Sequence, residues 1–115
     1  MIDWEDLALR RVAEIQRELP ESIRVRATEV PVFFSPARER KGGACLGVFQ
    51  GYSLLDGPPV RPHEMPRITL FFDTLARAAN FRESAFLREV RTTYLHELGH
   101  YFGWDEEQIT NAGPG

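Results

Sequence analysis

The chain contains 115 residues, of which 43% are hydrophobic and 27% charged, the composition of an ordinary globular domain. A chain of this length buries one modest core, so we expect a single domain over residues 1–115 and exclude large two-lobed enzyme architectures. Its formal net charge of −3 argues against a nucleic-acid-binding protein that neutralises phosphates and against an anionic membrane as partner. Because the single cysteine, Cys45, cannot form an internal disulfide, we expect a cytoplasmic protein, and no segment is apolar enough to span a membrane.

The first predicted element is an amphipathic helix that begins after Asp3, a good N-cap residue, and ends before Pro20. Its apolar face consists of Trp4, Leu7, Val12, Ile15 and Leu19. Apolar and polar residues then alternate over 23–27, and this pattern predicts a strand with one buried face. Pro31 should end this strand or mark it as an edge strand.

The middle of the chain is rich in loop signals. Residues 35–43 are polar and basic and include glycine, so we interpret them as a loop. A second apolar run follows at 45–55, where Gly47 and Gly51 indicate a bulge or the close approach of another backbone. Since the sequence Asp-Gly-Pro-Pro at 56–59 imposes a turn, we predict two short strands within the apolar run.

The clearest strand pattern lies at 68–72, after a further loop at 62–66. This strand could be a sheet edge that pairs with an extended peptide, but we favour an ordinary core strand. Asp73 is a candidate cap for a short helix over 74–79.

The longest periodic segment is a helix that begins near Glu83 or Ser84 and runs to Phe102. Apolar residues recur in it at steps of three and four and should face the core: Leu87, Val90, Tyr94, Leu98 and Tyr101. The order of helix, strands and helix predicts an α+β domain in which helices pack on one sheet.

This long helix carries His96, Glu97 and His100 in the pattern His-Glu-x-x-His, which is typical of zinc hydrolases. Side chains four residues apart on a helix have Cβ atoms about 5–6 Å apart, so both imidazoles can reach one ion. The two histidines lie about 40° apart around the helix and point away from the apolar stripe. Glu97 lies to one side of them, as suits a carboxylate that accepts a proton from water and does not bind the metal.

A catalytic zinc takes three protein ligands, so the motif leaves a third ligand to be found. Gly103 can adopt a positive φ angle and end the helix, which lets the chain turn back toward the metal. Glu106, ten residues after His96, is the first candidate for the third ligand, followed by Asp105 and then by His63 from an upstream loop. Asp105 is also suited to cap a short last helix, which would leave Glu106 as the ligand.

The run from His96 to Glu106 has the extended form His-Glu-x-x-His-x-x-Gly-x-x-acid and resembles the minimal zincin-like metallopeptidases, a small bacterial family. The resemblance covers nearly the whole chain and implies an N-terminal helix, a small mixed sheet of about four strands and a C-terminal active-site helix. It further implies zinc peptidase activity, with His96 and His100 as ligands and Glu97 as the general base. Glu106 stands where the family usually has aspartate, and the methionine turn of larger relatives is absent.

These features predict a cytoplasmic Zn²⁺-dependent metallopeptidase whose partners are peptide or protein substrates. Short or unfolded peptides are expected, because so small a domain can wall only a shallow cleft. The alternative is a non-catalytic metal-binding or protein-interaction module of the same fold. The oxyanion formed during hydrolysis needs a further donor, for which His63, Tyr94 and Tyr52 have suitable side chains.

Overall fold

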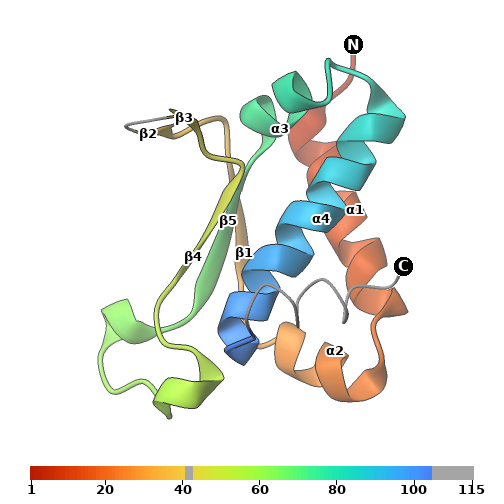
Figure 1. Cartoon of the computed structure of the whole chain (residues 1–115). Helices are drawn as coiled ribbons and strands as arrows, with labels where there is room; N and C mark the ends of the chain where they lie inside the picture. Colours follow the sequence, from red (N-terminus) through yellow and green to blue (C-terminus); the bar gives the residue numbers. More distant parts are fainter. Residues whose placement is uncertain (41–42, 105–115) are drawn as a thin grey trace.

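The computed structural model describes residues 1–40 and 43–104, which form an α+β fold (Figure 1). The helices are α1 (Trp4–Glu18), α2 (Glu21–Ala27), α3 (Phe72–Ala78) and α4 (Glu83–Phe102). The strands are β1 (Val32–Ser35), β2 (Glu39–Arg40), β3 (Gly43–Ala44), β4 (Gly47–Gln50) and β5 (Arg67–Phe71). Between β4 and β5 the chain forms two 3₁₀ turns, η1 (Leu54–Asp56) and η2 (Pro62–Glu64). Within the described ranges, no helix has both the length and the apolar character needed to cross a bilayer.

The main sheet is mixed and has the order β1-β5-β4. β1 runs parallel to β5, and β4 runs antiparallel to it, with Phe49 opposite Ile68. β2 and β3 pair separately as a short antiparallel ribbon. The α+β prediction is therefore confirmed, although the described residues form a three-stranded sheet and a ribbon where about four strands were expected in one sheet. β5 is the central strand, as favoured from its sequence, so β1 and β4 are the edges.

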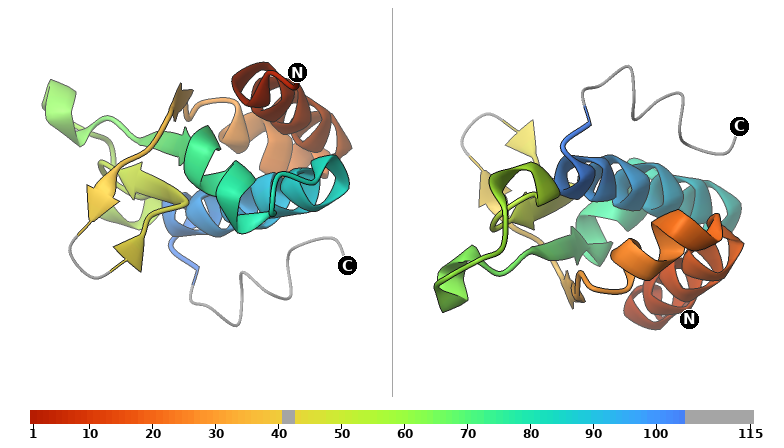
Figure 2. Two further views of the ribbon diagram at one scale, coloured as in Figure 1. Left: turned by 90° about the horizontal axis from the view of Figure 1, so that it is seen from above. Right: turned by 90° about the horizontal axis from the view of Figure 1, so that it is seen from below.

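The hydrophobic core lies between this sheet and the two long helices, which run side by side along one of its faces (Figures 1 and 2). The largest fully buried side chains are Tyr94, Phe86, Ile15, Ile68, Leu70, Leu75, Val30 and Val90. The buried Tyr94 hydroxyl accepts a hydrogen bond of 3.0 Å from Gln16 Nε2, which ties α4 to α1 and satisfies a polar group inside the core. The predicted apolar stripe of α4 thus faces the core, with Leu87 partly buried at its start.

The ends of both long helices follow the predicted capping rules. Asp3 caps α1, and its carboxylate accepts the backbone N–H of Asp6 at 3.0 Å. At the end of α4, Gly103 has φ +74° and donates its N–H to the carbonyl of His100, while Trp104 donates to the carbonyl of Gly99. These paired bonds form a Schellman motif, so the helix ends at Phe102, two residues after the second histidine.

The strand predicted at 23–27 is wrong, because this segment belongs to α2. Ile23 and Ala27 lie four positions apart on one helical face and pack toward the core, whereas Val25 is exposed. An alternation over so few residues therefore fits both the two-residue period of a strand and the helical period of about 3.6 residues. The strand of this region instead begins directly after Pro31, as β1.

The apolar run at 45–55 contains one of the two predicted strands, β4. The second predicted strand is wrong, because the chain folds into η1 there. Ser53 and Asp56 form a capping box. The Ser53 side chain accepts a hydrogen bond from the backbone at Asp56, and the Asp56 side chain accepts one from the backbone at Ser53, which closes a helical turn.

The helix α3 starts earlier than predicted. The strand expected at 68–72 ends at Phe71, and Phe72 is already the first helical residue. Asp73 therefore lies within the first turn of α3 and is not its N-cap, although a carboxylate there still interacts favourably with the helix dipole.

Candidate metal centre

The two motif histidines lie on the side of α4 that faces away from the core. His96 is partly buried, and the His100 side chain is 44% exposed. Their rings are nearly perpendicular to each other, at 81°, and their Nε2 atoms are 3.3 Å apart. Both nitrogens therefore point toward one place beside the last two turns of the helix.

This separation fits a shared metal ion. Two nitrogen ligands that each lie about 2.0–2.1 Å from a tetrahedral zinc are about 3.3–3.4 Å apart. The Nε2 atoms of His96 and His100 already have this spacing, at 3.3 Å. The pair therefore needs no rearrangement of the helix to hold one ion.

Glu97 completes a compact group of donor atoms. Its carboxylate oxygen Oε1 lies 4.0 Å from His100 Nε2, and the candidate ligand atoms of His96, Glu97 and His100 all lie within 4.8 Å of one another. The Glu97 side chain is only 13% exposed, so it faces the same partly enclosed space and not open solvent. Two imidazoles suit a divalent transition metal as ligands, and a carboxylate this close to them could act on water bound to the same ion.

The edge strand β4 lies directly beside this group. Gly47, its first residue, allows the close approach, because a Cβ atom there would lie 2.8 Å from Thr93 Cγ2 and 3.0 Å from Leu70 Cδ2. The nearest atoms at Gly47 are thus side-chain methyl groups, whereas the close approach of another backbone expected for these glycines occurs at Gly51, beside the Met65 carbonyl. β4 and α4 together wall a cavity of about 500 Å³, which is lined by Gly47, Val48, Phe49, Gly51, Ser53, Asp56, His96, Glu97 and His100.

The loop between β4 and β5 contributes Ser53 and Asp56 to this cavity. Gly51 begins the loop with φ +100°, and a Cβ atom there would collide with the Met65 carbonyl. Inside the loop, the buried Glu64 carboxylate accepts the backbone N–H of Val60 at 2.8 Å. This hydrogen bond, with further ones from Arg61 and Tyr52 and the nearby His63, keeps the pKa of Glu64 below its ordinary value despite desolvation.

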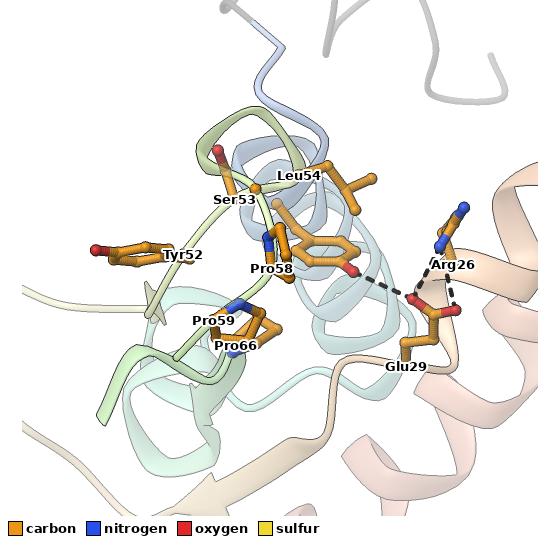
Figure 3. Close-up of a pocket in the computed structure, with 10 residues that line it drawn as sticks. Arg26, Glu29, Tyr52, Ser53, Leu54, Pro58, Pro59 and Pro66 are labelled. Carbon is orange, nitrogen blue, oxygen red and sulfur yellow. Dashed lines mark hydrogen bonds and ion pairs between the residues drawn. The ribbon is translucent and has the colours of Figure 1, made fainter. Parts of the chain in front are cut away.

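Residues of the same loop also line a second cavity of about 350 Å³ (Figure 3). Arg26 and Glu29 lie on one side of it, and the prolines of the loop lie on the other. The Tyr101 hydroxyl donates to Glu29 Oε2 at 3.3 Å. Burial raises the pKa of Tyr101, and the Glu29 carboxylate raises it further, so this hydroxyl stays a protonated donor.

The other predicted site residues are not found in this group. His63 is exposed in η2 and is not part of the His96, Glu97 and His100 group. Glu106 and Asp105, the first two candidates for the third ligand, lie outside the described residues.

None of the three proposed oxyanion donors lines the cavity that the described residues form around His96. Tyr94 is in the core, Tyr52 lines the second cavity, and His63 lies in η2. Sequence reasoning also missed Ser53 and Asp56. The Ser-x-x-Asp spacing is a capping-box signal that could have identified η1, but not its place beside the metal group.

The described residues form an α+β fold in which His96, Glu97 and His100 on α4 lie next to a sheet edge, and this group could hold a metal ion. Comparison with family models agrees with this interpretation. A model described as zincin-like metallopeptidase matches residues 20–114, and the chain belongs to that family. No curated protein matches the chain.

Proposed function

We propose that this protein is a zinc-dependent metallopeptidase, in which His96 and His100 hold the ion and Glu97 is the general base. The observation that carries the proposal is the 3.3 Å separation of the two Nε2 atoms, with the Glu97 carboxylate beside them. Membership of the zincin-like metallopeptidase family supports the same reading. Glu106 stays the proposed third ligand, with Asp105 as the alternative.

Each side chain has a distinct task in this proposal. A bound zinc ion would polarise the scissile carbonyl group and acidify the attacking water. His96 and His100 would hold the ion through their Nε2 atoms, and the helix keeps these two atoms at the required spacing. Glu97 accepts a proton from the water and donates it to the leaving amine, and its limited exposure of 13% keeps bulk solvent from competing for that proton.

The substrate is expected to bind along β4. This strand is an edge of the sheet, and Val48 and Phe49 line the cavity that contains the histidines. An extended peptide can pair with the open backbone of such a strand, as an added strand of the sheet. β5 cannot take this role, because β1 and β4 occupy both of its edges.

The variant Glu97→Gln tests this function. It should bind zinc as the wild type does and lose hydrolysis of unstructured peptides by a factor of about 10²–10⁴, because the general base is removed and the ligands are not. Zinc content is measured by atomic absorption and hydrolysis by release of free amines. Full activity in the variant would refute the role of Glu97.

The same experiment separates the enzyme from the alternative of a non-catalytic metal-binding or protein-interaction module. Such a module would bind zinc in both proteins and hydrolyse no peptide in either. His96→Ala is the matched control for the ligand set, since it should lose zinc as well as activity.

A further inference from the structure

One carboxylate in the metal cavity has no part in the proposed reaction. Asp56, the last residue of η1, lines the cavity together with His96, Glu97 and His100. It comes from the loop between β4 and β5, whereas the three motif residues come from α4. A peptide bound in this cavity would therefore meet both walls.

The position of the Asp56 carboxylate is fixed by Ser53. Its Oδ2 atom accepts the backbone N–H of Ser53 at 2.9 Å and the Ser53 hydroxyl at 3.1 Å. That hydroxyl in turn accepts the N–H of Leu55 at 3.2 Å. Among the described residues, these hydrogen bonds use Oδ2 and leave Oδ1 as an acceptor for a ligand in the cavity.

The charged side chains that line the cavity indicate which kind of hydrogen-bond donor would bind Asp56 Oδ1. Two carboxylates, Asp56 and Glu97, line it with the two imidazoles, and no lysine or arginine is among its described lining residues. The Asp56 carboxylate meets no lysine or arginine among those lining residues, so a positively charged nitrogen would give it a charge-assisted hydrogen bond, which is the stronger kind.

We propose that Asp56 is a specificity-determining residue, which accepts a hydrogen bond from a cationic nitrogen of the bound peptide. That nitrogen is either the side-chain group of lysine or arginine or a free α-amino group. This inference rests on the proposed peptidase function and adds to it a preference for cationic substrates. Ser53 is the positioning residue that holds the carboxylate in place.

The test is peptide binding, measured by fluorescence anisotropy at low salt on zinc-loaded Glu97→Gln protein, which is expected not to consume the peptide. The probes are short peptides with one lysine placed in turn at each position, the same peptides with glutamine in its place, and versions with an acetylated N-terminus. We expect about a five-fold tighter binding of the cationic peptide, the upper range for an exposed ion pair. Higher salt should weaken this preference.

Asp56→Asn, made in the same background, should reduce the preference to less than about two-fold. Asparagine keeps an oxygen that can accept the Ser53 N–H, so η1 should stay folded while the charge is lost. Asp73→Asn is the matched control, since it removes an equal charge from an exposed position in α3, outside the cavity, and should keep the preference.

The outcomes separate the two cation sources and the two proposals. A preference that follows the lysine identifies the side chain as the source, and one that is lost on acetylation identifies the α-amino group. Equal binding of all peptides, or an unchanged preference in Asp56→Asn, would overturn the role of Asp56. If the wild type binds zinc and cleaves peptides without this preference, the peptidase function is supported and the role of Asp56 is refuted. Absence of zinc binding and of cleavage would overturn both the peptidase function and the role of Asp56.

Discussion

At the scale of single residues, Glu64 shows how one side chain can organise a loop. Its carboxylate binds the backbone N–H groups of Val60 and Arg61, at 2.8 and 3.1 Å, and its carbonyl accepts the Tyr52 N–H at 2.7 Å. These bonds link the two halves of the loop between β4 and β5. Since this loop supplies Ser53 and Asp56 to the cavity that His96 and His100 line, Glu64 supports the candidate site without touching it.

The lowered pKa of Glu64 makes a prediction about stability against pH. A folded-state pKa below the ordinary value of 4.5 means that the charged form stabilises the fold above that pH, and that this contribution is lost as the pH falls through the lower folded value. Glu64→Gln should therefore unfold at a lower temperature than the wild type at pH 7. The difference should shrink as the pH falls below 4.5 and through the lower folded-state value, because the protonated Glu64 side chain is then neutral, as glutamine is.

Thermal unfolding followed by circular dichroism checks this prediction. Glu18→Gln, a substitution of an exposed glutamate at the end of α1, is a suitable control for the loss of charge alone. A difference between wild type and Glu64→Gln that stays constant across this pH range would contradict the proposed role of the Glu64 charge.

At the scale of elements, the long helices could be predicted from sequence and the short segments could not. α1 and α4 repeat their apolar pattern over several turns and carry caps at Asp3 and Gly103, so local signals agree with tertiary packing. The segment 23–27 holds too few residues to distinguish a helical from a strand period. Tertiary packing decides there, through the burial of Ala27.

In the candidate site, too, the residues on a long helix could be predicted from the sequence and those on a short segment could not. His96, Glu97 and His100 come from one helix, whose fixed spacing brings them together in any fold that keeps the helix. Ser53 and Asp56 come from a loop more than thirty residues earlier, and their approach depends on the path of β4 beside α4. No local pattern in the sequence encodes that path.

The contact between β4 and α4 gives a prediction at this scale. Gly47→Ala would place a methyl group 2.8 Å from Thr93 Cγ2, inside van der Waals contact, so the strand and the helix must separate. We expect a loss of stability of about 1–3 kcal/mol, typical of overpacking, and a lower kcat/KM for peptides, because the substrate edge moves from the histidines.

The double variant Gly47→Ala/Thr93→Ser tests the cause. Serine lacks the methyl group that the new Cβ would meet, so it should restore part of the stability and of the activity. Urea unfolding and peptide hydrolysis measure both effects. A double variant that is no better than Gly47→Ala would show that the contact with Thr93 is not the reason for the loss.

At the scale of the whole molecule, one helix serves both the core and the site. α4 buries Val90, Tyr94 and Leu98 against α1 and the sheet, and it presents His96 and His100 on its other side. In a chain of 115 residues the core is modest, so an ion that holds the last turns of this helix should have a measurable effect on global stability.

Zinc is therefore expected to stabilise the entire fold by mass action. At a free zinc concentration of about 100 times Kd, binding to the native state alone adds about 2.7 kcal/mol, which raises the Tm of a domain of this size by roughly 10 °C. Chelation should remove the increase. Because His96→Ala and His100→Ala each delete a proposed ligand, both should lose the increase, whereas Glu97→Gln and His63→Ala should keep it. An equal increase in His96→Ala would mean that the stabilising ion binds elsewhere, and that the paired nitrogens of α4 are not its site.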